Sequence, residues 1–139
     1  MNTVADIYKL IECEYGIKLD KLNSNSDLMG ELGIYGDDFD ELMLAYAKKF
    51  DVNLDSYLWY FHTCEEVGSP FAFIFPPPNK RVKRIVITPE LLSKYANLKK
   101  WAVKYPEHSL PKYRWDIISL KIFFVLCVLL GLFLAFVKS

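Results

Sequence analysis

Apolar residues recur at helical spacing in three separate stretches of the chain. In the first stretch, Thr3 and Asp6 have the spacing of a capping box, and the apolar residues that follow lie at positions i, i+3, i+4 and i+7: Val4, Ile7, Tyr8 and Ile11. Gly16 is the residue type that most often ends a helix. The pattern therefore predicts a first helix over residues 4–14.

The second stretch predicts a helix that begins near Asp37 and ends near Phe50. Its apolar side recurs every three to four residues, at Phe39, Leu42, Met43, Tyr46 and Phe50. Acids crowd its first turns and lysines occupy its last turn: Asp37, Asp38, Asp40 and Glu41, then Lys48 and Lys49. Because negative charge at the start of a helix and positive charge at its end both favour the helix dipole, the charges support the same boundaries.

A third helix should begin at Pro89, because Thr88 is a favourable N-cap residue and proline is favoured at the first helical position. Its predicted apolar face, which Trp101 closes, contains Leu91, Leu92, Tyr95 and Leu98. The insert between the second and third helices, about residues 63–87, contains the run PPP and has no helical periodicity. Two of its segments, FAFIF (71–75) and RVKRIVI (81–87), are compatible with a short hairpin or with an extended loop.

The last stretch is apolar on every side. Residues 122–137 are 16 residues without a charge, and extension back to Trp115 gives a mostly apolar segment of 23 residues, 115–137. A helix needs about 20 residues to cross the hydrocarbon core of a bilayer. The alternative, a buried C-terminal helix, requires a larger core than about 110 other residues can form around it. The segment is therefore predicted to be a transmembrane helix, with Lys121 snorkelling to one interface.

Charge and cysteine content narrow the function classes. The chain has no net charge, but residues 1–60 carry 12 acids and 5 lysines, whereas residues 61–139 carry 5 acids and 12 lysines and arginines. The acidic half would repel phosphates, so nucleic-acid binding is not expected. The cysteines show no paired spacing, so neither a disulfide framework nor a zinc site is predicted for Cys13, Cys64 and Cys127. The N-terminus has acids where a secretion signal needs a basic start.

These observations divide the chain into a domain over residues 1–104, a proline-containing linker over residues 105–114, and the transmembrane helix over residues 115–137. Cations cluster before the span, at Lys99, Lys100, Lys104, Lys112 and Arg114, and only Lys138 follows it. Positively charged flanks stay on the cytoplasmic side of a membrane. We therefore expect a single-pass, tail-anchored membrane protein whose N-terminal domain is cytoplasmic.

The region around the second helix resembles the acyl carrier protein family, over about residues 3–62. In that family an L-G pair precedes a helix that carries the phosphopantetheine serine at its start and an E-L pair soon after. Leu32 and Gly33 match the first pair, Glu41 and Leu42 match the second, and Phe50 with Asp51 matches the end of the helix. With this resemblance, the predicted fold is mainly α: an acyl-carrier-protein-like small helical bundle with an irregular or short-hairpin insert, plus one C-terminal transmembrane helix.

In this register the phosphopantetheine serine of the carriers falls on Gly36. A phosphodiester link needs a hydroxyl, which glycine lacks, so no cofactor is predicted. Gly36 is interpreted as a residue that permits a positive φ where the turn meets the helix. The other serines considered do not lie at a helix start beside the L-G pair: Ser24, Ser26 and Ser56.

A second resemblance covers more of the chain. The sequence G-D-D in place of the carriers' D-S-L, together with ITPELLSKYANLKKW after the insert, is similar to a bacterial family of unknown function with an acyl-carrier-like fold, over about residues 1–101. This resemblance implies a fold and no reaction. It also makes the bacterial inner membrane the expected location.

The acidic helix start suggests a protein partner. In acyl carrier proteins this face is read by enzymes through basic patches, so a partner with a basic surface is predicted to bind Asp37, Asp38, Asp40 and Glu41. Two alternatives stay open: the acids only favour the helix dipole and keep a solvated face, or they hold a divalent cation. Because no D-x-D-x-D-G loop is present, no metal is predicted. His62 and Cys64 hint at a catalytic pair, but a structural histidine is the commoner role, so no catalytic residue and no enzyme is predicted.

The predicted function is therefore a non-catalytic, membrane-anchored interaction module that lacks the phosphopantetheine serine. Two other classes stay open, which are a true carrier modified at another serine and a small membrane regulator or immunity-type protein whose span is the active part. The FAFIF run has two interpretations as well. It either contacts the lipid surface or packs against the helices, and we expect the packing.

Overall fold

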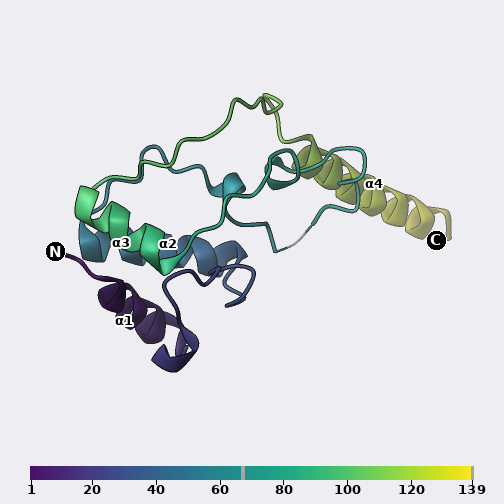
Figure 1. Ribbon diagram of the computed structural model, residues 1–139. Helices are drawn as coiled ribbons and strands as arrows, with labels where there is room; N and C mark the ends of the chain where they lie inside the picture. The colour runs from purple at the N-terminus through teal and green to yellow at the C-terminus, as the bar shows by residue number, and fades with distance from the viewer. Residues whose placement is uncertain (67, 139) are drawn as a thin grey trace.

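Three amphipathic helices form the N-terminal domain of the computed structural model, which describes residues 1–66 and 68–138. They are α1 (Val4–Tyr15), α2 (Gly36–Phe50) and α3 (Pro89–Leu98). Figure 1 shows them gathered at one end of the molecule, with α1 against α3 and α2. The three predicted helices are confirmed, and α2 begins one residue before the predicted start.

The helix ends are formed by the capping residues that the sequence predicts. Thr3 and Asp6 make the capping box, in which the Thr3 N–H donates to Asp6 Oδ2 at 2.8 Å. Gly16 ends α1 in the left-handed conformation, with φ 64°. The Thr88 hydroxyl oxygen accepts the Leu91 N–H at 3.2 Å, and Pro89 occupies the first position of α3.

The apolar faces of the three helices meet in one core. All five predicted core residues of α2 are buried, and the Tyr46 hydroxyl donates to the Leu92 carbonyl oxygen at 2.7 Å, which ties α2 to α3. The prediction for α3 is wrong at Leu98, which is 50% exposed. The reason is the direction of the buried face, which at 100° per residue is centred nearly opposite Leu98. The buried residues of α3 are Pro89, Leu92, Ser93, Tyr95 and Ala96.

The insert is irregular. Among its described residues there is no β-strand, and its only helical element is the short 3₁₀ turn η3 (Pro78–Lys80); the turns η1 (Leu19–Lys21) and η2 (Trp59–Phe61) precede it. The hairpin alternative is therefore not formed. The end of the insert still joins the domain, because Ile87 is buried and its carbonyl oxygen accepts the Leu28 N–H at 3.1 Å.

Residues 101–114 return across the domain without helix or strand. They start at an isolated parallel bridge between Asn53 and Lys100, after which the Trp101 N–H donates to the Asn53 carbonyl oxygen at 2.8 Å. Trp101 is buried, and its indole N–H donates to the Tyr105 hydroxyl at 2.8 Å. The first part of this segment is thus held against the domain by specific contacts.

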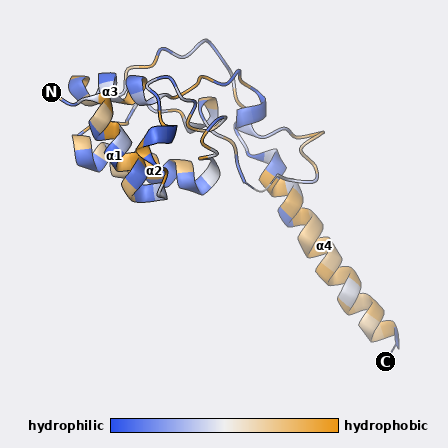
Figure 2. Cartoon of the chain, turned by 60° about the horizontal axis from the view of Figure 1, so that its bottom comes forward, coloured by the Kyte–Doolittle hydropathy of each residue, from blue (hydrophilic) through white to orange (hydrophobic). Residues whose placement is uncertain are grey.

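Helix α4 (Trp115–Lys138) projects away from the domain and is hydrophobic along most of its length (Figure 2). By length and composition it is able to cross a membrane. None of its most apolar window is buried against the described part of the chain. The alternative of a buried C-terminal helix is therefore contradicted, and the predicted mainly helical fold with one long apolar C-terminal helix is confirmed.

Candidate functional site

The start of α2 is built around Gly36. Its φ is 59°, as predicted for the turn into the helix, and its N–H donates to the buried Thr63 hydroxyl at 3.1 Å. The side chain of Glu66 lies over the glycine, so that a Cβ at residue 36 would clash with Glu66 Cγ. The space that a side chain at residue 36 would enter is therefore filled by the Glu66 side chain.

An open groove of about 460 Å³ lies beside this helix start. We call it the acidic groove. One wall is the first turns of α2, a second wall is the chain from η2 into the insert, and a third is the first turns of α4. Its lining residues are Gly36, Asp37, Asp40, Trp59, Thr63, Cys64, Glu65, Glu66, Ile117 and Leu120.

The carboxylates of the acidic groove are mostly without a cationic partner. Among the described residues, Asp37, Asp40 and Glu66 form no ion pair, and only Glu65 does. Burial, and then the charge of neighbouring Asp37, raise the pKa of Asp40. A raised carboxyl pKa means that the negative charge is held at a cost, which an incoming cation would reduce.

The structure separates the four predicted site residues into two pairs. Asp37 and Asp40 line the acidic groove. Asp38 and Glu41 act on the other side, where burial and then their charges raise the pKa of the Tyr15 hydroxyl in α1. The Tyr15 hydroxyl donates to the Asp38 carbonyl oxygen. Burial, followed by the charges of Asp38 and Glu41, raises the pKa of Tyr15 to about 12. The four acids therefore do not form one cluster.

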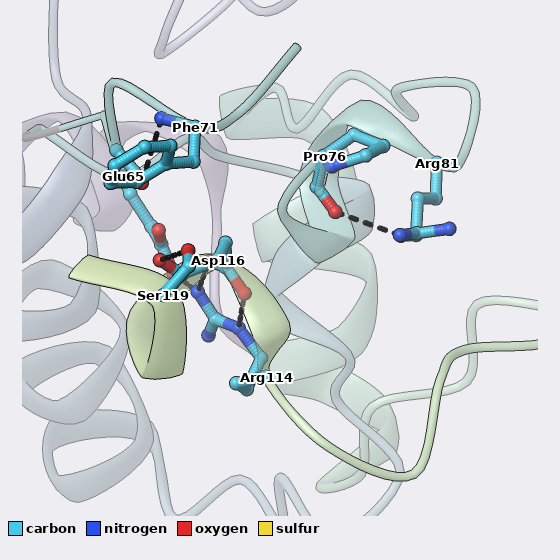
Figure 3. Close-up of polar contacts among 8 residues, drawn as sticks. Glu65, Phe71, Pro76, Arg81, Arg114, Asp116 and Ser119 are labelled. Atoms are coloured by element: carbon cyan, nitrogen blue, oxygen red, sulfur yellow. Dashed lines mark hydrogen bonds and ion pairs between the residues drawn. The ribbon is translucent and has the colours of Figure 1, made fainter. Parts of the chain in front are cut away.

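An ionic junction joins the acidic groove to α4. Arg114 Nη2 lies 2.6 Å from Glu65 Oε1 and 2.5 Å from Asp116 Oδ2, and Arg114 Nε donates to Asp116 Oδ1 at 2.9 Å. Figure 3 shows the guanidinium of Arg114 held between the two carboxylates. Asp116 is buried in the first turn of α4. The junction fixes the insert to the base of the apolar helix.

His62 has a structural environment. The Tyr105 hydroxyl accepts the N–H groups of Trp101 Nε1 and Leu58 at 2.8 and 3.1 Å, so its own proton points to His62 Nε2 at 2.8 Å. His62 Nδ1 therefore carries the ring proton and donates to the Ile85 carbonyl oxygen at 2.9 Å. Burial lowers the pKa of His62 to about 4. Both ring nitrogens are thus occupied in a neutral ring, which leaves none for a reaction with Cys64.

The metal and serine alternatives gain no support. Within the two described ranges, no three His, Cys, Asp or Glu side chains are placed to hold a metal ion. Ser26 is buried, the Ser56 hydroxyl donates to the Trp101 carbonyl oxygen at 2.7 Å, and Ser24 precedes the L-G pair. The Thr63 hydroxyl at the start of α2 is buried and accepts the Gly36 N–H.

Sequence reasoning missed the walls of the groove that lie far from α2 in the chain. These are Trp59, Thr63, Glu65 and Glu66, and Ile117 and Leu120 of α4. One signal was present, because the adjacent pair Glu65–Glu66 stands out in a half of the chain that has only 5 acids.

Comparison with protein families assigns the chain to one of them. The model of the family described as "Protein of unknown function (DUF1493)" matches residues 1–105. The chain belongs to the DUF1493 family. No curated protein and no solved structure matches the chain significantly. The DUF1493 match contains the start of α2, the insert and the His62–Tyr105 contact, and it ends before α4.

Proposed function

We propose that the protein is a non-catalytic interaction module, anchored in a membrane by α4, whose acidic groove binds a basic segment of a partner protein. The observation that carries the proposal is the unpaired negative charge in a groove at the base of an apolar helix. Three of its carboxylates have no cation among the described residues, and the pKa of one of them is raised. A Lys or Arg side chain is the complement of such a site.

The resemblance to acyl carrier proteins supports the location of the partner site. Carriers present the start of the corresponding helix to their enzymes, and this chain keeps acids there. A prosthetic arm has no attachment point at residue 36, since Gly36 offers no hydroxyl and Glu66 occupies the space where a side chain would begin. On this proposal, the scaffold has kept the docking face of a carrier without the arm.

The charges before α4 support an orientation. Lys99, Lys100, Lys104, Lys112 and Arg114 lie within the sixteen residues that precede the helix. Cations near the end of a transmembrane helix favour the cytoplasmic side. The domain would then face the cytoplasm, with the acidic groove close to the membrane surface. Because Ile117 and Leu120 of α4 line the groove, a partner that is itself at the membrane has the shortest path to it.

Two matched charge reversals test the proposal. Asp37→Lys/Asp40→Lys inverts the groove pair, and Asp38→Lys/Glu41→Lys inverts the pair on the α1 side with the same change in net charge. The full-length chain, extracted in mild detergent, is used to capture proteins from membranes at low and high salt. The groove variant should lose its captured protein, the control should lose less, and high salt should weaken capture by the wild type. Equal capture by wild type and groove variant would refute the proposal.

A further inference from the structure

Five consecutive residues of the insert lie outside the domain core. Phe71, Ala72, Phe73, Ile74 and Phe75, here called the apolar loop, are absent from the core of the described chain, and Phe73 and Ile74 are 82% and 56% exposed. The expected packing of this run against the helices of the domain is therefore wrong. The prolines at 76–78 and the turns at 70–74 carry the chain away from α1, α2 and α3.

The apolar loop is placed against α4. The ring of Phe71 lies 5.5 Å from that of Phe123, and the ring of Phe75 lies 6.4 Å from that of Trp115. Trp115 and Phe123 are about 12 Å apart along the axis of a helix that rises 1.5 Å per residue. The loop thus runs beside the first two turns of α4, as Figure 1 also shows.

A second groove separates the loop from the helix, and it is almost purely apolar. Its volume is about 410 Å³, and its walls include Phe71, Phe75, Trp115, Ile118, Ile122 and Phe123. Large exposed apolar surfaces mark contacts with proteins or membranes. The apolar groove continues onto α4, which is itself exposed and apolar. We therefore expect the groove and the helix to be covered by the same apolar environment.

The junction at Arg114 links the insert, which contains the apolar loop, to α4. Arg114 binds Glu65 at the start of the insert and Asp116 at the start of α4, so entry of α4 into a bilayer would bring the insert to its surface. Two cations follow the apolar loop in the sequence, Lys80 and Arg81. Arg81 Nε donates to the Pro76 carbonyl oxygen at 2.8 Å (Figure 3). Among the described residues, neither side chain pairs with a carboxylate.

We propose that the apolar loop is a second membrane contact, which inserts Phe73 and Ile74 into the acyl-chain boundary beside α4 while Lys80 and Arg81 bind anionic phospholipid headgroups. The occupant of the apolar groove is then lipid. The flanking cations favour lipid over a partner helix, because an anionic surface attracts Lys and Arg next to inserted aromatic residues. This inference rests on the proposed membrane anchoring by α4.

The second contact would fix the orientation of the domain relative to the membrane. A helix with a flexible linker would let the domain rotate freely above the bilayer, whereas two contacts on one side of α4 restrict it. The acidic groove, which shares Glu65 with the junction, would then open in one direction along the membrane surface.

Depth-dependent quenching tests the inference on the full-length chain. The cysteines form no disulfide, so they can be replaced, and single cysteines are introduced for an environment-sensitive dye at Phe73→Cys, Leu130→Cys and Leu98→Cys. Leu130 lies in α4 and reports anchoring; Leu98 is exposed at the end of α3 and serves as the control. The protein is reconstituted in vesicles of phosphatidylcholine and phosphatidylglycerol that carry quenchers on the acyl chains.

The inference predicts several-fold stronger quenching at residues 73 and 130 than at residue 98. Replacing phosphatidylglycerol by phosphatidylcholine, or introducing Lys80→Gln/Arg81→Gln, should reduce quenching at residue 73 and leave residue 130 unchanged. Quenching at residue 130 without quenching at residue 73 would refute the loop contact and leave the anchoring by α4 intact. A cross-link from residue 73 to a second copy of the chain or to another protein would also refute the loop contact. No quenching at residue 130 would overturn the anchoring and this inference with it.

Discussion

Acidification should destabilise the domain through His62. The folded protein keeps this ring neutral, with a pKa of about 4, whereas the ordinary value in the unfolded chain is 6.5. Between these values the unfolded state binds more protons, so the free energy of unfolding decreases as the pH falls. The stability is fully present above about pH 6.5 and is lost progressively on the way down to about pH 4.

The size of the effect follows from the two pKa values. Lowering the pH from about 7.5 to about 5 should reduce the free energy of unfolding by about 2 kcal/mol, and the full shift corresponds to about 3 kcal/mol. Protonation at Nε2 would break the hydrogen bond that this nitrogen accepts from Tyr105, whereas Nδ1 would continue to donate to the Ile85 carbonyl oxygen. The segment that leads to α4 would therefore loosen from the domain at Tyr105.

The assay is urea unfolding of the full-length chain in mild detergent, followed by tryptophan fluorescence. Trp101 is a suitable probe because its ring lies 5.4 Å from that of His62. His62→Gln should lower stability at neutral pH but remove about 2 kcal/mol of the pH dependence. Asp40, whose pKa is raised, acts in the opposite sense and is common to both proteins. An unchanged pH dependence in His62→Gln would refute the argument, as would an NMR titration in which His62 protonates near pH 6.5.

Three further outcomes are expected. Gly36→Ala should destabilise the domain by about 1–2 kcal/mol, because alanine is strained at the positive φ of residue 36. Adding Glu66→Ala should remove the clash with the new Cβ but not the backbone strain, so a double-mutant cycle in urea should show only partial recovery of the free energy of unfolding. Tyr46→Phe should cost about 1 kcal/mol in the same assay, since it removes the hydrogen bond between α2 and α3. Arg114→Lys keeps the charge but loses the fork that grips two carboxylates, so amide hydrogen exchange should become faster in the insert and at the start of α4 and stay unchanged in α1.

The helices of the domain were predictable because their signals are local. The capping box at Thr3, the N-cap at Thr88 and the apolar spacing of α2 depend on residues within a few positions of one another. The error at Leu98 arose where the third helix ends, because the last turn of a short helix has too few residues to define its buried face.

The candidate site was only half predictable. The acids of α2 and the conformation of Gly36 were visible in the sequence, but Glu66 approaches Gly36 from 30 positions away and α4 closes the groove from further still. The insert has no periodicity, so nothing in its sequence specified which surface FAFIF would meet. Long-range packing decided both points.

On the proposed function, a basic partner at the membrane occupies the groove at the start of α2. The most direct measurement places a photocrosslinking phenylalanine analogue at Trp59, which lines the groove, in the full-length protein in living cells, with Leu98 as the control position. A membrane-associated adduct should form from residue 59, be absent from residue 98, and be lost when Asp37 and Asp40 are changed to lysine. An adduct that persists in that variant, or no adduct from residue 59 at all, would contradict the proposed function.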